Sequence, residues 1–347
     1  MRIRDFFKYG TPTAILSVGQ LGTIHAKTTY GLLRHSKVLR PVCVIAEQAG
    51  KNIEEFVKPI RYKVPIVKDI NSAIFLGAKV LTLGVSNPGG VLDKKLKPYI
   101  KEAIEKGMDI LSGLHVKISQ IEEFKELATR KGVRIIDLRI PPKDLKVLKG
   151  DLYKRKSKVI CILGTDCVVG KRTTAVQLWE RALKRGLKSG FIATGQTGIM
   201  IGADEGIVLD TVPSDFVSGI MENMVLKLDR EGKEYIFVEG QGALLHPAYG
   251  QVTLGIIHGS KPDFIVMVHD PDRKRFDSFP NIPFKPCLEK EIELVEIFSR
   301  GGEVIAVSVI GKKCEKMLNL PVIDSFNERD LDIVINKILG REEQNGI

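Results

Sequence analysis

Residues 158–174, K-V-I-C-I-L-G-T-D-C-V-V-G-K-R-T-T, decide the fold of the chain around them. The apolar run 159–163 is typical of a strand that is buried on both faces. After Lys171, apolar residues recur at helical spacing, and Gly186 is a suitable stop for that helix. A strand, a glycine-bearing turn with a lysine, and a helix together predict a phosphate-binding loop.

The turn departs from the usual phosphate-binding pattern in two ways. Gly164 and Gly170 enclose five residues instead of four, although Thr165 in the place of the first glycine restores the spacing. Arg172 stands where a serine or threonine normally offers its hydroxyl to magnesium. An ordinary strand–helix turn with a solvated lysine remains the alternative. We predict that eight residues of this stretch bind the cofactor: Gly164, Thr165, Asp166, Gly170, Lys171, Arg172, Thr173 and Thr174.

The composition narrows the class of protein. A length of 347 residues favours two domains, and 44% hydrophobic with 27% charged residues is ordinary for a soluble protein. The chain contains no run of 18 apolar residues, and residues 1–8 lack the apolar core of a secretory signal. Five cysteines without a C-x-x-C pair indicate reduced thiols. We therefore expect a cytoplasmic protein that does not enter a membrane.

The net charge of +11 raises the question of a nucleic-acid partner. Aromatic residues make up only 6% of the chain, and no basic run is interleaved with them. We expect instead a small phosphate-bearing ligand, a lysine-rich solvated surface and no bound nucleic acid. Abundant Lys, Glu, Ile and Val with few Gln indicate a thermophile as the source. We also expect a homo-oligomer.

Five apolar runs precede the phosphate-loop stretch, and they predict a first α/β domain. They lie at 13–18, 40–46, 80–85, 109–111 and 133–138 and alternate with helical patterns at 92–106 and 119–130. This alternation is typical of a parallel sheet. Ser119-Gln120-Ile121-Glu122 reads as a capping box. Asn87-Pro88-Gly89-Gly90 ends the third run in a loop, where open sheets place ligands.

Pro141-Pro142 and the lysine-rich segment that follows mark a domain connection, because two prolines continue neither a helix nor a strand ladder. We therefore predict an α/β domain at 1–142, a linker at 143–157 and a second α/β domain at 158–347. Each domain is expected to have a parallel sheet between two layers of helices.

Three predicted strands of the second domain end in polar turns, which begin at Gly164, Thr194 and Glu239. The carboxyl ends of parallel strands meet at one edge of a sheet, so polar side chains from these turns should share one crevice. Glu239 and His246 are the candidate proton acceptors. Gln196 and Gln241 are candidate cofactor ligands, and Glu239 with Asp210 could hold Mg²⁺. Capping or loop roles are the structural alternatives for these carboxylates.

The motifs together resemble one known family. They are G-T-D-C-V-V-G-K-R-T-T at 164–174, A-T-G-Q-T-G-I-M-I at 193–201, V-E-G-Q-G-A-L-L-H-P-A-Y at 238–249, T-L-G-I-I-H-G at 253–259 and S-G-L-H at 112–115. The chain is similar over nearly its whole length to the D-glutamate N-acetyltransferase-like family. The resemblance implies a Rossmann-like N-terminal domain, a P-loop NTPase-like C-terminal domain, and acetyl transfer from acetyl-CoA to the amine of an amino acid.

The second domain resembles dethiobiotin synthetase more distantly, through G-T-D, V-G-K and E-G-x-G. That resemblance implies ATP and magnesium, with Glu239 as a magnesium ligand, but Arg172 stands in place of the threonine that binds the metal there. Three functions therefore remain open at this point: an acetyltransferase, an ATP-dependent ligase or kinase, and a non-enzymatic nucleotide-binding switch.

Overall fold

The computed structural model describes residues 1–86, 91–311 and 316–340. It divides the chain into two compact units, which we describe separately. The first unit takes Met1–Pro141 together with Gln196–Ala203, and the second takes Pro142–Gly195 and the chain from Asp204 onward. The predicted ligand-side loop Asn87-Pro88-Gly89-Gly90 lies outside the described residues.

The first unit is built on a parallel sheet with the strand order β3-β2-β1-β4-β5-β6. This is the order of a Rossmann-like sheet, with its switch point between β1 and β4. The apolar runs of the sequence form its interior strands because their branched side chains are buried on both faces. The strands are β1 (Thr11–Leu16), β2 (Leu39–Ile45), β3 (Ile66–Val67), β4 (Val80–Leu83), β5 (Asp109–Ser112) and β6 (Ile135–Asp137).

Helices cover both faces of this first sheet. One face packs on α2 (Ile70–Phe75), α3 (Lys97–Glu105) and α4 (Glu122–Lys131), which share an apolar core with the strands. On the other side, α1 (Lys27–His35) contacts α6 (Gln196–Ile201), a helix supplied from late in the sequence. The hydroxyls of Thr28 and Thr197 are 2.8 Å apart across this contact.

The capping-box prediction at Ser119 is wrong. Ser119 lies inside a short 3-10 helix, Ile118–Gln120, and its backbone N–H donates to the Asp137 carboxylate at 2.9 Å. Helix α4 begins only at Glu122, after Ile121, whose side chain offers no cap. Ser119 therefore does not cap the helix as the S-x-x-E pattern predicts, because its backbone is hydrogen-bonded to Asp137 at the end of β6.

The second unit has a larger sheet with the order β13-β14-β12-β11-β7-β10-β8-β9. Its pairs are parallel except for β13 with β14, which is antiparallel. The phosphate-loop strand β7 is therefore central, flanked by β10 and β11. The strands are β7 (Lys158–Gly164), β8 (Ser189–Ala193), β9 (Glu205–Gly206), β10 (Tyr235–Glu239), β11 (Phe264–Val268), β12 (Glu303–Ser308), β13 (Lys316–Met317) and β14 (Leu320–Ile323).

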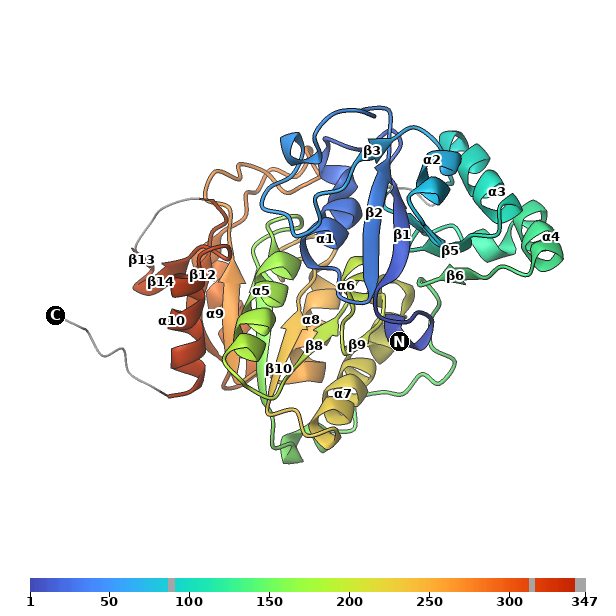
Figure 1. Cartoon of the computed structure of the whole chain (residues 1–347). Helices are drawn as coiled ribbons and strands as arrows, with labels where there is room; N and C mark the ends of the chain where they lie inside the picture. The colour runs from blue at the N-terminus through green and yellow to red at the C-terminus, as the bar shows by residue number, and fades with distance from the viewer. Residues whose placement is uncertain (87–90, 312–315, 341–347) are drawn as a thin grey trace. The chain divides into compact units, whose positions relative to one another are not determined.

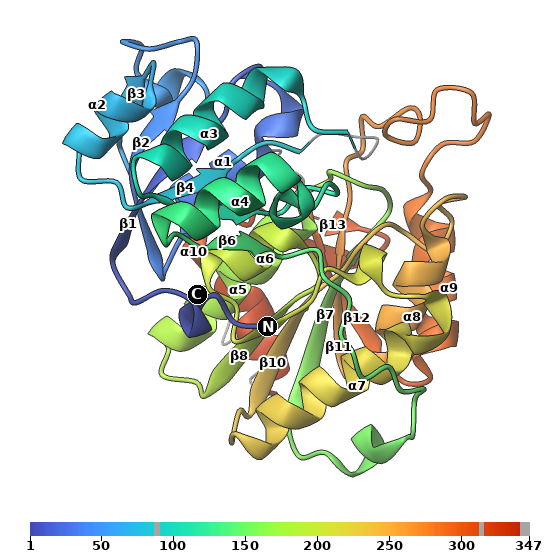
Figure 2. The same cartoon turned by 90° about the vertical axis from the view of Figure 1, so that its right-hand side faces the viewer.

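Two layers of helices enclose this sheet, as the two cartoon views show (Figures 1 and 2). On one face, α5 (Lys171–Lys184) packs beside α10 (Glu328–Ile338), and Arg181 of α5 pairs with Asp332 of α10 at 2.5 Å. On the other face lie α7 (Ser214–Arg230), α8 (Gly250–Ser260) and α9 (Leu288–Ser299). The predicted fold class, two parallel-sheet α/β domains with a Rossmann-like and a P-loop part, is confirmed.

Residues 143–157, predicted as a linker, belong to the second unit and are anchored on α7. The Glu222 carboxylate accepts hydrogen bonds from the backbone N–H of Lys149 at 2.6 Å and of Leu152 at 3.3 Å. A Cβ at Gly219 would lie 2.0 Å from the carbonyl oxygen of Lys146, so glycine permits this close approach. The predicted domain boundaries themselves stay a prediction.

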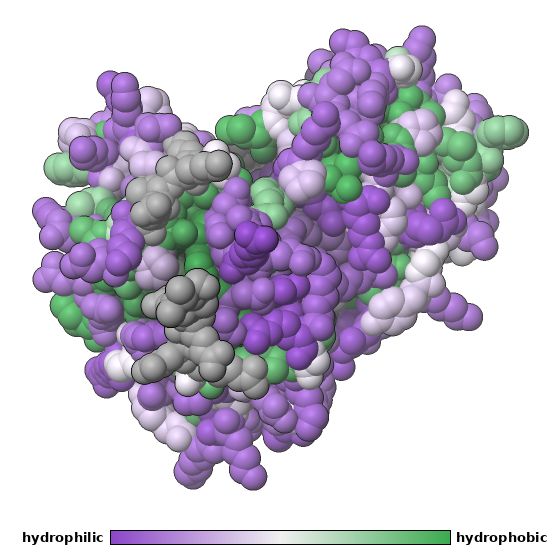
Figure 3. Space-filling view, turned by 60° about the vertical axis from the view of Figure 1, so that its left-hand side comes forward, coloured by the Kyte–Doolittle hydropathy of each residue, from purple (hydrophilic) through white to green (hydrophobic). Residues whose placement is uncertain are grey.

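The face of the molecule drawn in Figure 3 is mainly polar. Hydrophilic residues cover most of the face drawn in Figure 3, and hydrophobic residues form small groups between them. Each helix in the described part of the chain is too short or too polar to cross a membrane.

Candidate functional site

The turn between β7 and α5 holds a shape that glycine makes possible. Gly170, the residue before α5, has φ +112°, and a Cβ there would lie 2.3 Å from Ile310 Cδ1. At Gly164, the last residue of β7, a Cβ would lie 2.7 Å from the carbonyl oxygen of Val268. Both glycines of the predicted loop are therefore required by the fold of the turn.

Lys171 closes the turn from inside. Its side chain is buried, and Nζ donates to the carbonyl oxygen of Asp166 at 2.6 Å and of Gly242 at 2.8 Å. Burial lowers the pKa of the Lys171 ammonium, while the neighbouring Cys167, Asp166, Glu291 and Glu239 act in the opposite direction. The ammonium thus joins the phosphate-loop turn to the loop that follows β10.

Glu239 and Arg172 form an electrostatic pair beside the turn. Glu239 ends β10 with 8% of its surface exposed, and its Oε2 accepts from the backbone N–H of Thr194 at 3.2 Å. Burial raises the pKa of Glu239, and the positive charge of Arg172 acts against that rise. Burial also lowers the pKa of Arg172, and Glu239 opposes that change. The positive charge of Arg172 therefore favours the ionised form of the Glu239 carboxylate.

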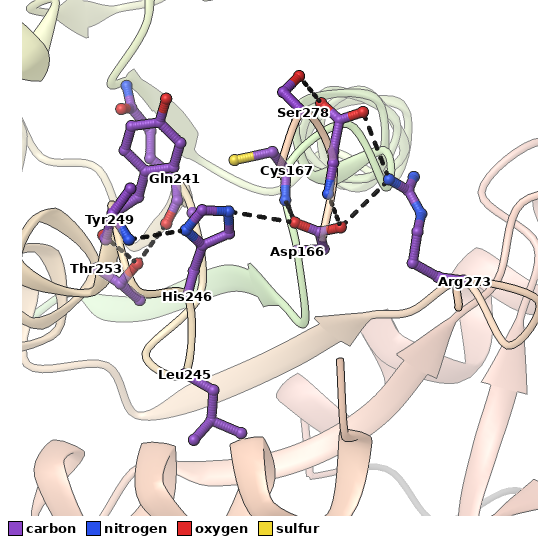
Figure 4. Close-up of polar contacts among 12 residues, drawn as sticks. Asp166, Cys167, Gln241, Leu245, His246, Tyr249, Thr253, Arg273 and Ser278 are labelled. Atoms are coloured by element: carbon purple, nitrogen blue, oxygen red, sulfur yellow. Dashed lines mark hydrogen bonds and ion pairs between the residues drawn. The ribbon is translucent and has the colours of Figure 1, made fainter. Parts of the chain in front are cut away.

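His246 follows β10 in a turn of its own and is only 1% exposed. Its Nδ1 accepts a hydrogen bond from the backbone N–H of Ala248 at 3.2 Å, and its Nε2 lies 3.7 Å from Asp166 Oδ1 (Figure 4). The rings of Tyr249, Phe276 and Phe279 pack around it, with centroid distances of 4.7, 4.9 and 5.1 Å. Burial lowers the pKa of His246, and Asp166 acts in the opposite direction.

Asp166 also contacts residues 269–287, the segment between β11 and α9, which we call the covering segment. The fully buried Asp166 carboxylate accepts from the backbone N–H of Cys167 at 2.6 Å and of Asp277 at 2.9 Å. Arg273 Nη1 donates to the same carboxylate at 3.2 Å (Figure 4). Burial raises the pKa of Asp166, and these hydrogen bonds and Arg273 oppose the rise. Asp166 therefore positions the covering segment in this structure.

The remaining residues predicted in the turn and on α5 have structural contacts. The hydroxyl of Thr165 is 2.9 Å from His269 Nδ1. Thr174 lies within hydrogen-bond distance of two buried serine hydroxyls, Ser325 at 2.7 Å and Ser308 at 3.1 Å. Thr173 is buried. Thr174 therefore braces α5 against neighbouring strand ends.

Three further predicted residues lie in different surroundings. The side-chain amide of Gln241 donates to the carbonyl oxygen of Thr194 within the second unit. Gln196 belongs to the first unit, where its side-chain oxygen accepts from Arg139 Nη2 at 3.1 Å. Asp210 is exposed in the 3-10 helix Leu209–Thr211. Of these three, Gln241 is hydrogen-bonded to Thr194, whose backbone N–H also donates to the Glu239 carboxylate.

Among the described residues, the group of three or more side chains that could share a metal ion is Asp166, Cys167 and His246, with ligand atoms within 4.8 Å of one another. Two cations stand beside it, because Arg273 contacts the Asp166 carboxylate and Lys171 contacts its backbone. The Asp166 carboxylate is therefore already paired with a cationic side chain in this structure, and a metal ion there would lie close to a like charge. Glu239 and Asp210, the predicted metal ligands, are not part of it.

Sequence reasoning missed Glu291, which supports the His246 turn from α9. Its carboxylate is 1% exposed and accepts from the backbone N–H of Leu244 at 2.5 Å and of Leu245 at 3.0 Å. Burial raises the pKa of Glu291. The available signal was its position on the apolar face of α9, shared with Leu288 and Val295. A carboxylate on such a face indicates a buried partner.

Sequence reasoning also missed Arg273 and the aromatic pair Phe276 and Phe279 of the covering segment. These residues lie in an irregular stretch where no periodic pattern exists to be read. Their importance follows only from the three-dimensional contacts with Asp166 and His246.

Comparison with known proteins identifies matching domains. A family model described as "Domain of unknown function (DUF1611_C) P-loop domain" matches residues 146–331. A second, "Domain of unknown function (DUF1611_N) Rossmann-like domain", matches residues 46–141. A crystal structure of a DUF1611 family protein from Anabaena variabilis is 30% identical, with a TM-score of 0.83 over 94% of this chain and 100% of that chain.

Two curated relatives carry a functional name. A D-glutamate N-acetyltransferase from Pseudoalteromonas sp. is 37% identical over 284 residues, which cover 77% of this chain and 83% of that protein. A D-glutamate N-acetyltransferase from Tritonibacter scottomollicae is 34% identical over 266 residues, covering 72% of this chain and 78% of that protein. The family resemblance predicted from the sequence motifs is confirmed.

We predict that Glu291→Gln destabilises the protein by about 1–3 kcal/mol, because one of two backbone donors would then face an amide NH₂ and lose its acceptor. The matched control is Glu289→Gln, the same change at an exposed position of the same helix. Urea denaturation of both variants measures the effect. Equal free energies of unfolding for the two variants would contradict the role given to Glu291.

Proposed function

Since this chain belongs to the DUF1611 family, we propose that it is an N-acetyltransferase that uses acetyl-CoA and acts on the amine of an amino acid. The relatives named D-glutamate N-acetyltransferases support both the reaction class and the first acceptor to test, D-glutamate. Within the site, the observation that carries the proposal is that the charges of Arg172 and Glu239 act on each other. This arrangement favours a ligand that is held without a metal ion.

The residues of the turn fit a phosphate-bearing donor. Lys171, Arg172 and Arg273 bring three cationic side chains to one region of the second unit. The N-terminus of α5 adds backbone N–H groups and the positive end of a helix dipole. We propose that these groups hold the phosphates, with Lys171 as the main anchor. Acetyl-CoA, when bound, supplies an acetyl group activated as a thioester.

Arg172 argues against a magnesium-bound nucleotide. A guanidinium does not lose its proton in proteins, so it would stand as a permanent positive charge where a divalent cation should bind. The adjacent Glu239 already has Arg172 as its opposite charge. We therefore propose that Lys171 and Arg172 contact phosphate oxygens directly, as charge-assisted hydrogen-bond donors.

Glu239 is the residue that we propose to take the proton of the attacking amine. A general base works best when its pKa approaches the working pH, and burial shifts the pKa of Glu239 in that direction. His246 suits the role less well, because the Ala248 N–H already occupies its Nδ1 lone pair. In this proposal, Glu239 accepts the amine proton at a carboxylate oxygen and Arg172 keeps the carboxylate oriented.

An ATP-dependent ligase or kinase is the second candidate, and one observation favours it. Glu239 ends the strand next to the phosphate-loop strand, the location of an acidic magnesium ligand in many nucleotide-hydrolysing enzymes. This candidate requires a metal ion at Glu239, so metal dependence separates it from the acetyltransferase.

We expect the purified protein to form an N-acetyl amino acid from acetyl-CoA and D-glutamate, with release of one free thiol per product. Mass spectrometry and a thiol assay measure the two products, with other D- and L-amino acids as alternative acceptors.

Lys171→Ala should weaken acetyl-CoA binding by about tenfold or more, the scale of a lost charged hydrogen bond. Lys184→Ala, an exposed change on the same helix, is the control.

One result of the acetylation assay would contradict the proposed function. If no amino acid is acetylated while ATP is consumed in the presence of one of them, the acetyltransferase proposal is wrong and the second candidate takes its place.

Arg172→Thr should create a metal requirement that the wild-type protein lacks. The threonine hydroxyl would stand beside a Glu239 that no longer has its guanidinium partner, and these are the ligand types that Mg²⁺ prefers. We expect ATP affinity of the variant to rise about tenfold or more when Mg²⁺ is added, whereas Arg172→Lys, which keeps a positive charge, should show no such gain. Calorimetry with and without a chelator measures both. An equal magnesium response in Arg172→Lys would show that the charge at position 172 does not exclude the metal.

A further inference from the structure

The backbone around His246 fixes which ring nitrogen carries the proton. The next residue, Pro247, has no N–H, so the first backbone donor after His246 is that of Ala248, which donates to Nδ1 at 3.2 Å. A neutral imidazole has one N–H and one lone pair. Because Nδ1 accepts a hydrogen bond, the lone pair is on Nδ1 and the hydrogen is on Nε2. In this tautomer Nε2 has no lone pair with which to accept a proton.

The surroundings favour the neutral ring. Three aromatic rings enclose it, and burial lowers its pKa. The charged groups that face it come from three elements: Asp166 and Lys171 from the turn and α5, and Asp277 from the covering segment. The carboxylates favour the protonated ring and Lys171 disfavours it, while protonation would also break the bond from Ala248. The geometry of that bond therefore agrees with a neutral donor.

The Nε2–H donor has no hydrogen-bond partner within the described part of the chain. The carboxylate oxygen Asp166 Oδ1 lies 3.7 Å away, beyond the 2.7–3.2 Å range of such bonds. An unsatisfied buried donor costs about 1–3 kcal/mol, so its presence in a well-packed site indicates that an acceptor comes from outside.

The cations nearby indicate the charge of that acceptor. The charged atom nearest to the Nε2–H is Asp166 Oδ1 at 3.7 Å, but Arg273 pairs with the other oxygen of that carboxylate at 3.2 Å, and Lys171 also acts on the ring. An oxygen that accepts from the Nε2–H together with Lys171 or Arg273 would meet cationic donors, and an anionic oxygen is the acceptor that such donors favour. Phe276 and Phe279 pack against the imidazole, and Figure 4 shows the polar edge of the ring turned toward Asp166.

We propose that His246 is a neutral hydrogen-bond donor of fixed tautomer, whose Nε2–H binds a phosphate oxygen of the ligand held by Lys171. This inference rests on the proposed phosphate-bearing donor, and it replaces the general-base role that the sequence predicted for His246. A neutral donor adds specificity for an oxygen acceptor without adding charge to the site.

The test uses two substitutions, each of which places an amide nitrogen at the position of one of the two ring nitrogens. The amide nitrogen of Gln reaches the place of Nε2, whereas that of Asn reaches only the place of Nδ1. We expect His246→Gln to keep CoA affinity within about threefold, and His246→Asn and His246→Ala to lose about tenfold or more, the scale of one hydrogen bond to a charged acceptor. Calorimetry is performed with CoA and with acetyl-CoA.

The assignment of the acceptor is tested by the same data. A loss of similar size for CoA and acetyl-CoA supports a phosphate oxygen. A loss confined to acetyl-CoA, with CoA binding unchanged, would overturn it in favour of the thioester carbonyl. If His246→Gln and His246→Asn lose CoA affinity equally, the donor role is overturned. The acetyltransferase proposal still stands in that case, provided that the wild-type protein acetylates its acceptor. Absence of both binding and acetyl transfer in the wild type would instead overturn the proposed function.

The tautomer has a readout that needs no ligand. ¹⁵N NMR of the wild-type protein, with His246→Gln used to assign the signals, should show a protonated Nε2 and an unprotonated Nδ1. Because burial lowers the pKa of His246 below its ordinary value, the ring should stay in this state as the pH falls to 6.5. A protonated Nδ1, or an imidazolium at pH 7, would overturn the proposal.

Discussion

The buried ammonium of Lys171 is the contact on which the rest of the site depends. It joins the turn after β7 to the loop after β10 through two backbone carbonyl oxygens. A buried charge is stable only when opposite charges and hydrogen bonds compensate its lost hydration. Asp166, Glu239 and Glu291 supply negative charge around it, and each of these carboxylates also fixes a backbone segment. The local architecture and the ligand binding that we propose therefore depend on one electrostatic arrangement.

Much of the fold was predictable because its signals are local. The branched run before the turn predicted β7, and the helical spacing after Lys171 predicted α5. Alternating strands and helices predicted two parallel sheets. The sequence also indicated Lys171 and Glu239, because Lys171 begins the helix after the turn that ends β7 and Glu239 ends the neighbouring strand β10. Side chains gather at this edge of the sheet by topology alone.

The other features depend on contacts between distant segments. Arg273 and Glu291 belong to the covering segment and to α9, and neither has a local pattern that points to the turn. Gln196 follows a strand of the second unit, yet its helix belongs to the first. The tautomer of His246 depends on a single backbone N–H, that of Ala248. Sequence spacing predicts which residues share an edge, but hydrogen-bond partners decide what each side chain does there.

The most direct test of the central claim, a phosphate site that works through cationic side chains without a metal, is a binding panel. Calorimetry with acetyl-CoA, CoA, ATP and ADP is performed on the wild-type protein, once with Mg²⁺ and once with a chelator. The account predicts that acetyl-CoA and CoA bind equally well in both conditions and that ATP gains little from Mg²⁺. Tight ATP binding that disappears with the chelator, together with no binding of either CoA compound, would contradict it.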